Sequence, residues 1–205
     1  MHKPIFVSGP HGGGKSALIQ RLIQRDNRLT ENDLTIDVAE EFQHLKLLSS
    51  FEKTLLRMLI RVVRVQRAYE MASNEPDRII LTDRSVYDSL AYAHVYRELE
   101  WVTSEEYMKL HAVKEKVPLH ARTIILNPPV ETLLERLENR KKNKERVVRD
   151  ALFNDEDTVE FVTLLQESFT AFEDDPNVIV VRNNEKDEIE KILQWIHHAP
   201  VLLRS

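Results

Sequence analysis

The residues best suited to chemistry in this sequence form one short run near the amino terminus, GPHGGGKS at positions 9–16. All four glycines of the 205-residue chain lie in this run, directly before Lys15 and Ser16. The spacing matches G-x-x-x-x-G-K-[ST], in which backbone N–H groups surround phosphate oxygens, the lysine reaches the β- and γ-phosphates and the hydroxyl binds Mg²⁺. Glycine suits a backbone that must adopt positive φ or approach another group closely. The run therefore predicts a site for a nucleotide polyphosphate.

The residues on either side of this run agree with that interpretation. Residues 4–8 are apolar and predict a buried strand, and residues 16–23 have the apolar spacing of a helix. A strand, a glycine loop and a helix bring backbone N–H groups and a helix N-terminus to one anion. We expect the following residues to contact ATP: Gly9, His11, Gly12, Gly13, Gly14, Lys15, Ser16 and Ala17.

Composition limits the possible classes of protein. The net charge of −5 disfavours a general nucleic-acid partner, and the absence of cysteine excludes disulfides and thiol chemistry. No apolar run approaches the roughly 18 residues of a membrane span, and no signal-peptide segment is recognisable. We expect a soluble, cytoplasmic protein.

The remaining elements predict an α/β fold in one domain, residues 1–205. Further strands are expected at 35–38, 78–82, 122–126 and 177–181, and they alternate with helical segments. The helices are expected at 51–73, 85–98, from 103 or 104, from about 130, from about 155, and at 185–198. Apolar strands joined through helices predict a five-stranded parallel sheet with helices on both faces, the three-layer αβα fold of P-loop NTPases.

The distribution of glycine narrows the function further. No glycine follows position 14, so the D-x-x-G switch of GTPases and the L-S-G-G-Q signature of transporter ATPases cannot occur. The chain is also short for an AAA+ motor with a helical lid domain. Small-molecule kinases remain among the P-loop proteins.

A second reactive pair, Asp83 and Arg84, follows the apolar segment 78–82. A carboxylate at the end of a strand beside the loop can hold Mg²⁺ through water, and an adjacent arginine can reach the transferring phosphoryl group. The alternative is that Asp83 only caps the next helix and Arg84 forms a surface ion pair. The D-R-S run resembles the motif after the corresponding strand of thymidylate kinases and deoxynucleoside kinases, and its continuation resembles nicotinamide-riboside-kinase-like proteins. This resemblance implies that Asp83 binds metal together with Ser16.

Two adjacent glutamates, Glu40 and Glu41, follow the strand expected at 35–38. In the deoxynucleoside kinases that the chain resembles, a glutamate at the end of this strand acts as base towards a hydroxyl acceptor. The proline that follows the family's glutamate is absent here. Neighbours on a strand point to opposite faces, so only one of the two is expected to face the site. Alternatively, both are solvated charges at a strand end.

A basic segment at about 136–150 follows a proline turn at 127–129 that resembles the turn before the lid of nucleoside and nucleotide kinases. The resemblance implies that lid arginines close over the phosphates, with Arg136 and Arg140 as the first candidates and Arg146 as a third. The alternative is an exposed, charged helix end.

Two other features have simpler interpretations. Arg57, Arg61 and Arg64 lie at i, i+4 and i+7 and could border an anionic pocket, but the ordinary polar face of an amphipathic helix is the preferred interpretation. His11 occupies a permissive position of the loop and needs no catalytic role.

These features together favour a kinase that transfers the γ-phosphoryl group of ATP, with Mg²⁺, to a small acceptor. The acceptor is expected to be a nucleoside, a nucleoside monophosphate or a related riboside. The alternatives are a nucleotide-binding regulatory ATPase and a kinase of another small metabolite. No nucleic-acid or membrane partner is expected, and the apolar tail 201–203 makes a homodimer plausible.

Overall fold

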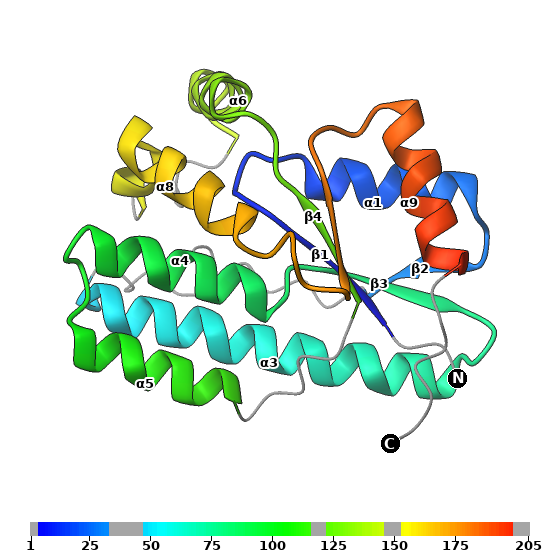
Figure 1. The fold of residues 1–205 in the computed structure, drawn as a ribbon, viewed down its shortest axis with the longest axis horizontal. Helices are drawn as coiled ribbons and strands as arrows, with labels where there is room; N and C mark the ends of the chain where they lie inside the picture. Colours follow the sequence, from blue (N-terminus) through cyan, green and yellow to red (C-terminus); the bar gives the residue numbers. More distant parts are fainter. Residues whose placement is uncertain (1–3, 33–46, 116–121, 146–152, 199–205) are drawn as a thin grey trace.

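The structure is a computed structural model that describes residues 4–32, 47–115, 122–145 and 153–198. Within these ranges a parallel sheet of five strands has the order β2-β3-β1-β4-β5 (Figure 1). The strands are β1 (Ile5–Ser8), β2 (Leu29–Glu31), β3 (Ile79–Asp83), β4 (Arg122–Leu126) and β5 (Val178–Val181). The predicted five-stranded parallel sheet is confirmed.

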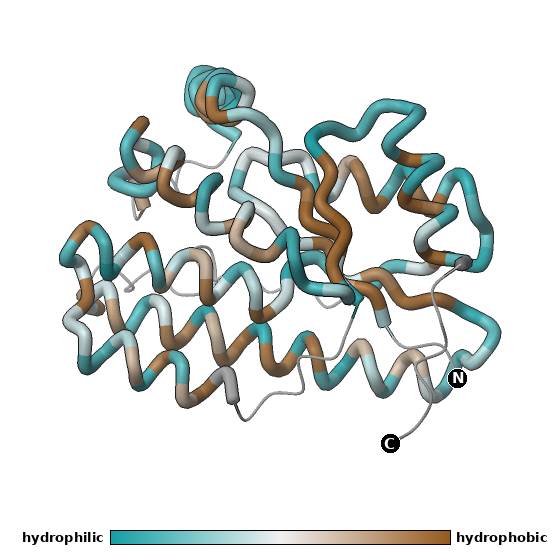
Figure 2. The backbone as a smooth tube through the Cα atoms, viewed as in Figure 1, coloured by the Kyte–Doolittle hydropathy of each residue, from teal (hydrophilic) through white to brown (hydrophobic). Residues whose placement is uncertain are grey.

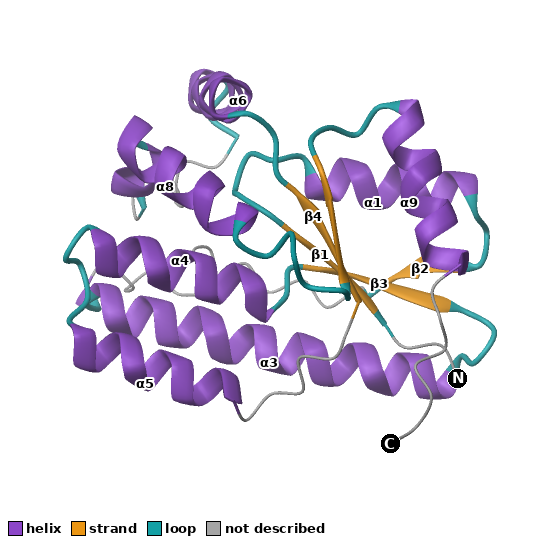
Figure 3. Ribbon diagram, in the orientation of Figure 1, coloured by secondary structure: helices purple, strands orange, loops and turns teal. Residues whose placement is uncertain are grey.

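Helices cover both faces of this sheet, as Figure 3 shows. α1 and α9 lie on one side, and α3, α4 and α8 lie on the other, with α5 packed outside α3 and α4 (Figure 1). α6 lies beyond the end of the sheet in Figure 1 and packs against α8. Their bounds are α1 (Lys15–Arg25), α3 (Ser50–Asn74), α4 (Val86–Glu98), α5 (Ser104–Glu115), α6 (Val130–Lys142), the 3₁₀ turn η2 (Asn154–Asp157), α8 (Val159–Thr170) and α9 (Lys186–His198).

Continuous apolar strands explain why both faces are covered. Successive side chains of a strand point to opposite faces, so an apolar run needs packing on both. Ile5 and Val7 of β1 pack in the core formed with α1 and α9, whereas Phe6 between them packs against α3 and α4. β4 and β5 accordingly form two continuously hydrophobic stretches of backbone in Figure 2.

The structure contains a strand, Leu29–Glu31, that the sequence did not predict. The sequence suggested residues 35–38, which lie outside the described residues, whereas the strand that pairs with β3 is Leu29–Glu31. Leu29 alone of its three residues is fully buried, so this edge strand lacks the apolar run that marks a central strand. Glu31, not Glu40 or Glu41, is therefore the glutamate at the end of β2.

The carboxyl ends of the parallel strands meet at one edge, and hydrogen bonds fix the segments that follow them. Ser85 caps α4 in a capping box with Asp88, and its hydroxyl lies 2.5 Å from that of Ser8 at the end of β1. The glycine loop after β1 and the Asp83-Arg84 pair after β3 are thereby held side by side. No helix among the described residues is long and apolar enough to cross a membrane.

The start of the glycine loop yields a stability prediction. Gly9 has φ 139°, and a Cβ there would lie 2.1 Å from the carbonyl oxygen of Leu126. Because that obstacle is backbone of a central strand, Gly9→Ala should lower the free energy of unfolding by about 2–5 kcal/mol in urea titrations. Gly13→Ala is the control: its φ is not positive and its Cβ would meet Pro10 O at 2.9 Å. A smaller loss for Gly9→Ala than for Gly13→Ala would contradict the account.

Candidate active site

The loop between β1 and α1 is a turn of backbone with few side chains. Gly12 and Gly14 have φ values of 76° and 94°, and the N–H of Gly13 bonds to Pro10 O at 3.1 Å. Gly14 is the N-cap of α1 and offers no side-chain oxygen to the first helical N–H groups. The helix therefore begins with its N–H groups directed at the loop, which suits an anion. Ser16 and Ala17, in the first turn, are exposed.

Lys15 is the buried cation of this loop, with only 6% of its surface exposed. Its ammonium group donates to the carbonyl oxygens of Gly9 at 2.9 Å and Pro10 at 2.8 Å. Burial, followed by the charge of Arg84, lowers the pKa of Lys15 from 10.5 to about 7. An anion bound beside Lys15 would relieve both effects, so the site favours a negatively charged ligand.

The predicted pair at the end of β3 faces the same region. Oδ1 of Asp83 is buried and has no hydrogen-bond partner among the described residues. Arg84 adopts φ 70° and bonds through Nη1 to Oδ1 of the fully buried Asp88 at 3.0 Å. The helix cap is Ser85, so the alternative in which Asp83 merely caps α4 is wrong.

These residues fit a magnesium ion. Mg²⁺ prefers oxygen ligands and commonly combines one or two protein groups with phosphate oxygens and water. No group of three potential metal ligands occurs in the described part of the chain, but such a site needs only one or two protein oxygens. The unpartnered Oδ1 of Asp83 and the exposed hydroxyl of Ser16 supply oxygens of the required kind.

The two candidate lid arginines within the described residues both lie near the loop. Arg136 donates from Nη1 to the carbonyl oxygen of Gly13 at 2.8 Å. Arg140 lies 3.7 Å from the carboxylate of Asp157, and its side chain is 11% exposed. The alternative of an exposed helix end therefore fails for these two residues. Residues 146–152, including Arg146 and the end of the predicted lid, lie outside the described residues, as do Glu40 and Glu41.

His11 has a structural role that the sequence did not reveal. Its ring is buried, with Nδ1 2.5 Å from the Tyr92 hydroxyl and Nε2 2.9 Å from Oδ1 of Asp157. Asp157 also contacts Lys141 at 3.2 Å. His11 thus connects the glycine loop to α4 and, through Asp157, to α6.

The structure corrects the prediction that the arginines of α3 form a solvated polar face. The preferred interpretation, a solvated polar face, is wrong for Arg57 and Arg61, because α3 packs against α4 along this stripe. Arg57 bonds to Glu156 at 2.9 Å and to Tyr96, and Arg61 bonds to Ser89 at 2.6 Å. The i, i+4, i+7 spacing was visible in the sequence, but the partner helix was not.

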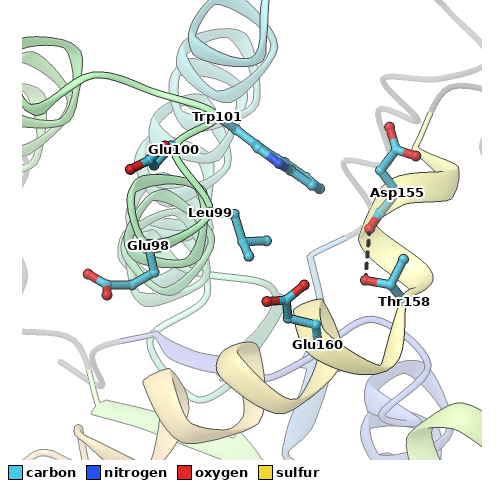
Figure 4. Close-up of a pocket in the computed structure, with 7 residues that line it drawn as sticks. All are labelled: Glu98, Leu99, Glu100, Trp101, Asp155, Thr158 and Glu160. Carbon is cyan, nitrogen blue, oxygen red and sulfur yellow. Dashed lines mark hydrogen bonds between the residues drawn. The ribbon is translucent and has the colours of Figure 1, made fainter.

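An open cavity of about 600 Å³, whose lining includes no residue of the glycine loop, lies between the turn after α4 and the start of α8 (Figure 4). Its wall carries four carboxylates and the ring of Trp101, which stacks on Phe161. Such a lining repels phosphate, so the cavity is distinct from the candidate nucleotide site. The lining residues are Glu98, Leu99, Glu100, Trp101, Asp155, Thr158 and Glu160.

The fold and this site define a P-loop nucleotide-binding domain. Residues 4–156 match the sequence family described as an AAA domain, and the chain belongs to that family. A curated relative, the probable thymidylate kinase of Metallosphaera sedula, is 28% identical over 142 residues. That match covers 67% of this chain and 66% of the relative, just under two thirds of its length.

Solved structures of a nucleoside kinase share the fold of this chain. Deoxyadenosine kinase from M. mycoides with bound dATP superimposes with a TM-score of 0.68 at 17% identity, covering 94% of this chain and 98% of that one. The same enzyme with bound dCTP has the same score and identity, with coverages of 96% and 100%. The predicted resemblance to P-loop nucleoside and nucleotide kinases is confirmed.

The lowered pKa of Lys15 predicts proton uptake on nucleotide binding. Above about pH 7 the free protein loses the Lys15 proton, whereas phosphates in the site favour the charged form, so ATP affinity should fall as pH rises. At about pH 8, calorimetry in buffers of different ionisation enthalpy should show uptake approaching about one proton per ATP. Lys15→Arg, which stays protonated, should lose this uptake. Binding of ATP by the wild-type protein without proton uptake would contradict the assignment.

Proposed function

We propose that this protein is an ATP-dependent kinase that transfers the γ-phosphoryl group to a small acceptor of the nucleoside or nucleotide type. One observation carries the proposal: the buried Lys15 of the glycine loop and the unpartnered carboxylate oxygen of Asp83 face one edge of the sheet. The similarities to a probable thymidylate kinase and to the fold of deoxyadenosine kinase support it.

The mechanism that follows is positioning with neutralisation of charge. The loop N–H groups and Lys15 would bind the phosphates of ATP. Ser16 and Asp83 would hold Mg²⁺, which when bound would neutralise phosphate charge. Arg84 contacts the transferring group from the β3 side. Arg136, now bonded to Gly13 O, and Arg140 supply further positive charge from the lid.

A hydroxyl acceptor would also need a base. Glu40 or Glu41 keeps this predicted role, and Glu31 at the end of β2 is a third candidate. Burial, followed by the charge of Asp83, raises the pKa of Glu31, so the two carboxyl groups act on each other. A raised carboxyl pKa makes a more effective base near neutral pH.

Several finer predictions complete the proposal. The sequence predicts that the metal is magnesium and that the protein is located in the cytoplasm. It also predicts a homodimer and no nucleic-acid partner. The apolar tail behind the dimer prediction lies outside the described residues.

Acceptor-dependent formation of ADP separates this proposal from its alternatives. Mg-ATP should be converted to ADP faster when a nucleoside or nucleoside monophosphate is added, and Lys15→Ala should slow transfer by about 100-fold or more. Lys109→Ala, at an exposed lysine paired with Glu105, is the control and should retain wild-type rates.

The other outcomes identify the alternatives. Hydrolysis of ATP that no small molecule accelerates would instead support a regulatory ATPase. Acceleration only by acceptors outside the nucleoside and nucleotide group would support a kinase of another metabolite.

A further inference from the structure

Arg61 is a buried cation without an acidic partner in the described structure. It lies in the middle of α3 and is 6% exposed. Its Nη1 donates to the Ser89 hydroxyl at 2.6 Å, and its guanidinium group lies 5.8 Å from the centre of the Tyr92 ring. Among the described residues, no carboxylate lies within the 4.0 Å of an ion pair with it.

Two nearby arginines, unlike Arg61, form ion pairs with carboxylates. Arg57, one turn earlier on α3, contacts Glu156 at 2.9 Å, and Arg84 contacts Asp88 at 3.0 Å. Asp88 is the acidic group whose charge acts on Arg61, but its oxygens already accept hydrogen bonds from Arg84 and from the N–H of Ser85. Burial lowers the pKa of Arg61, whereas the charge of Asp88 raises it. The effect of burial is the larger, and the pKa falls to about 10.

The charge of Arg61 acts on Lys15 of the glycine loop. Its charge and that of Arg84 both lower the pKa of Lys15, so the three cations act on one another. Two carboxylates, Asp83 and Asp88, act on Lys15 in the opposite direction. Asp83 is the proposed magnesium ligand, so a bound metal ion would leave less negative charge to balance Arg61 and Arg84.

A buried arginine without a carboxylate in ion-pair contact is unfavourable in the protein alone. An unpaired buried charge loses hydration without compensation, and apolar groups of similar size are often as stable or more stable in its place. A ligand with negative charge would provide the missing partner. The guanidinium group, with its fork of N–H donors, matches phosphate in particular.

Arg61 lies on a different side of the site from the residues expected to bind the ATP phosphates, so its anionic ligand is expected to be a different molecule. Lys15 and the loop reach the site from α1, whereas Arg61 reaches it from α3, which packs on the opposite face of the sheet (Figure 1). Resting on the proposed kinase function, we propose that Arg61 binds the phosphate of the acceptor, which is therefore a nucleoside monophosphate and not a neutral nucleoside.

The reaction balances without a protein base. An oxygen of the acceptor phosphate attacks the γ-phosphorus of ATP, the bond from that phosphorus to the oxygen bridging the β-phosphate breaks, and that oxygen leaves with ADP. The products are ADP and a nucleoside diphosphate. Because the attacking phosphate oxygen is already ionised near neutral pH, no proton has to be removed.

Matched acceptors give the first test. Each nucleoside is compared with its own 5′-monophosphate in ADP formation with Mg-ATP, and the same pairs are titrated by calorimetry without turnover. The proposal expects binding and transfer with monophosphates and a loss of at least about 10-fold in both for the nucleosides. Transfer to nucleosides alone would overturn this proposal and leave the kinase function standing. The absence of acceptor-dependent ADP formation would contradict the kinase function, and binding of no monophosphate in calorimetry would overturn the acceptor site by itself.

Substitution of Arg61 gives the second test. Arg61→Met should raise KM for the monophosphate by about 10- to 100-fold, with no increase in KM for ATP. The temperature of thermal unfolding should stay the same or rise, because an unpaired buried charge is removed. Arg61→Lys, which keeps the charge without the fork, should lose less affinity for the monophosphate than Arg61→Met. Arg67→Met, at an exposed position of the same helix, is the matched control.

A purely structural arginine would behave differently in these variants. Arg61→Met would then lower the temperature of unfolding and leave KM for the monophosphate at its wild-type value. An increase in KM for ATP alone would instead assign Arg61 to the donor phosphates. Either result overturns the proposal.

Discussion

Several positively charged side chains are buried where β1 and β3 end. The arrangement of the site depends on the negative charges, from carboxylates or from a ligand, that compensate them. Lys15, Arg61 and Arg84 act on one another there, opposed by Asp83 and Asp88. Buried charges without sufficient counter-charge are unfavourable, so the cluster favours ligands that carry several negative charges. A phosphate chain has that property, and a metal ion at Asp83 would help to hold it in place.

The fold supplies these charges from elements that are distant in sequence. A parallel sheet brings its carboxyl ends to one edge, and helices on both faces let Lys15 and Arg61 approach that edge from opposite sides. Short polar contacts then set the geometry: Ser85 joins β1 to the start of α4, and His11 joins the loop to Asp157. The site is therefore held by hydrogen bonds between layers, while the apolar core holds the layers themselves.

Sequence patterns predicted the parts of the site that depend on local structure. The glycine loop, Lys15 and the Asp83 segment are contiguous motifs, and the central strands are apolar runs, so all could be located. The edge strand at Leu29–Glu31 was missed because a short, half-exposed strand has almost no apolar signal. The burial of Arg61 was missed because a stripe of arginines has the same spacing whether water or another helix covers it. The roles of Glu40 and Glu41 stay predictions, since both lie outside the described residues.

A crystal structure with a bisubstrate analogue would test the central claim most directly. The analogue joins adenosine to a second nucleoside through five phosphates and so represents donor and acceptor together. The account predicts one continuous phosphate chain that runs from the glycine loop past Lys15, with its acceptor end bonded to the guanidinium group of Arg61. A chain that follows the loop but leaves Arg61 without a phosphate contact, or one bound outside the loop, would contradict it.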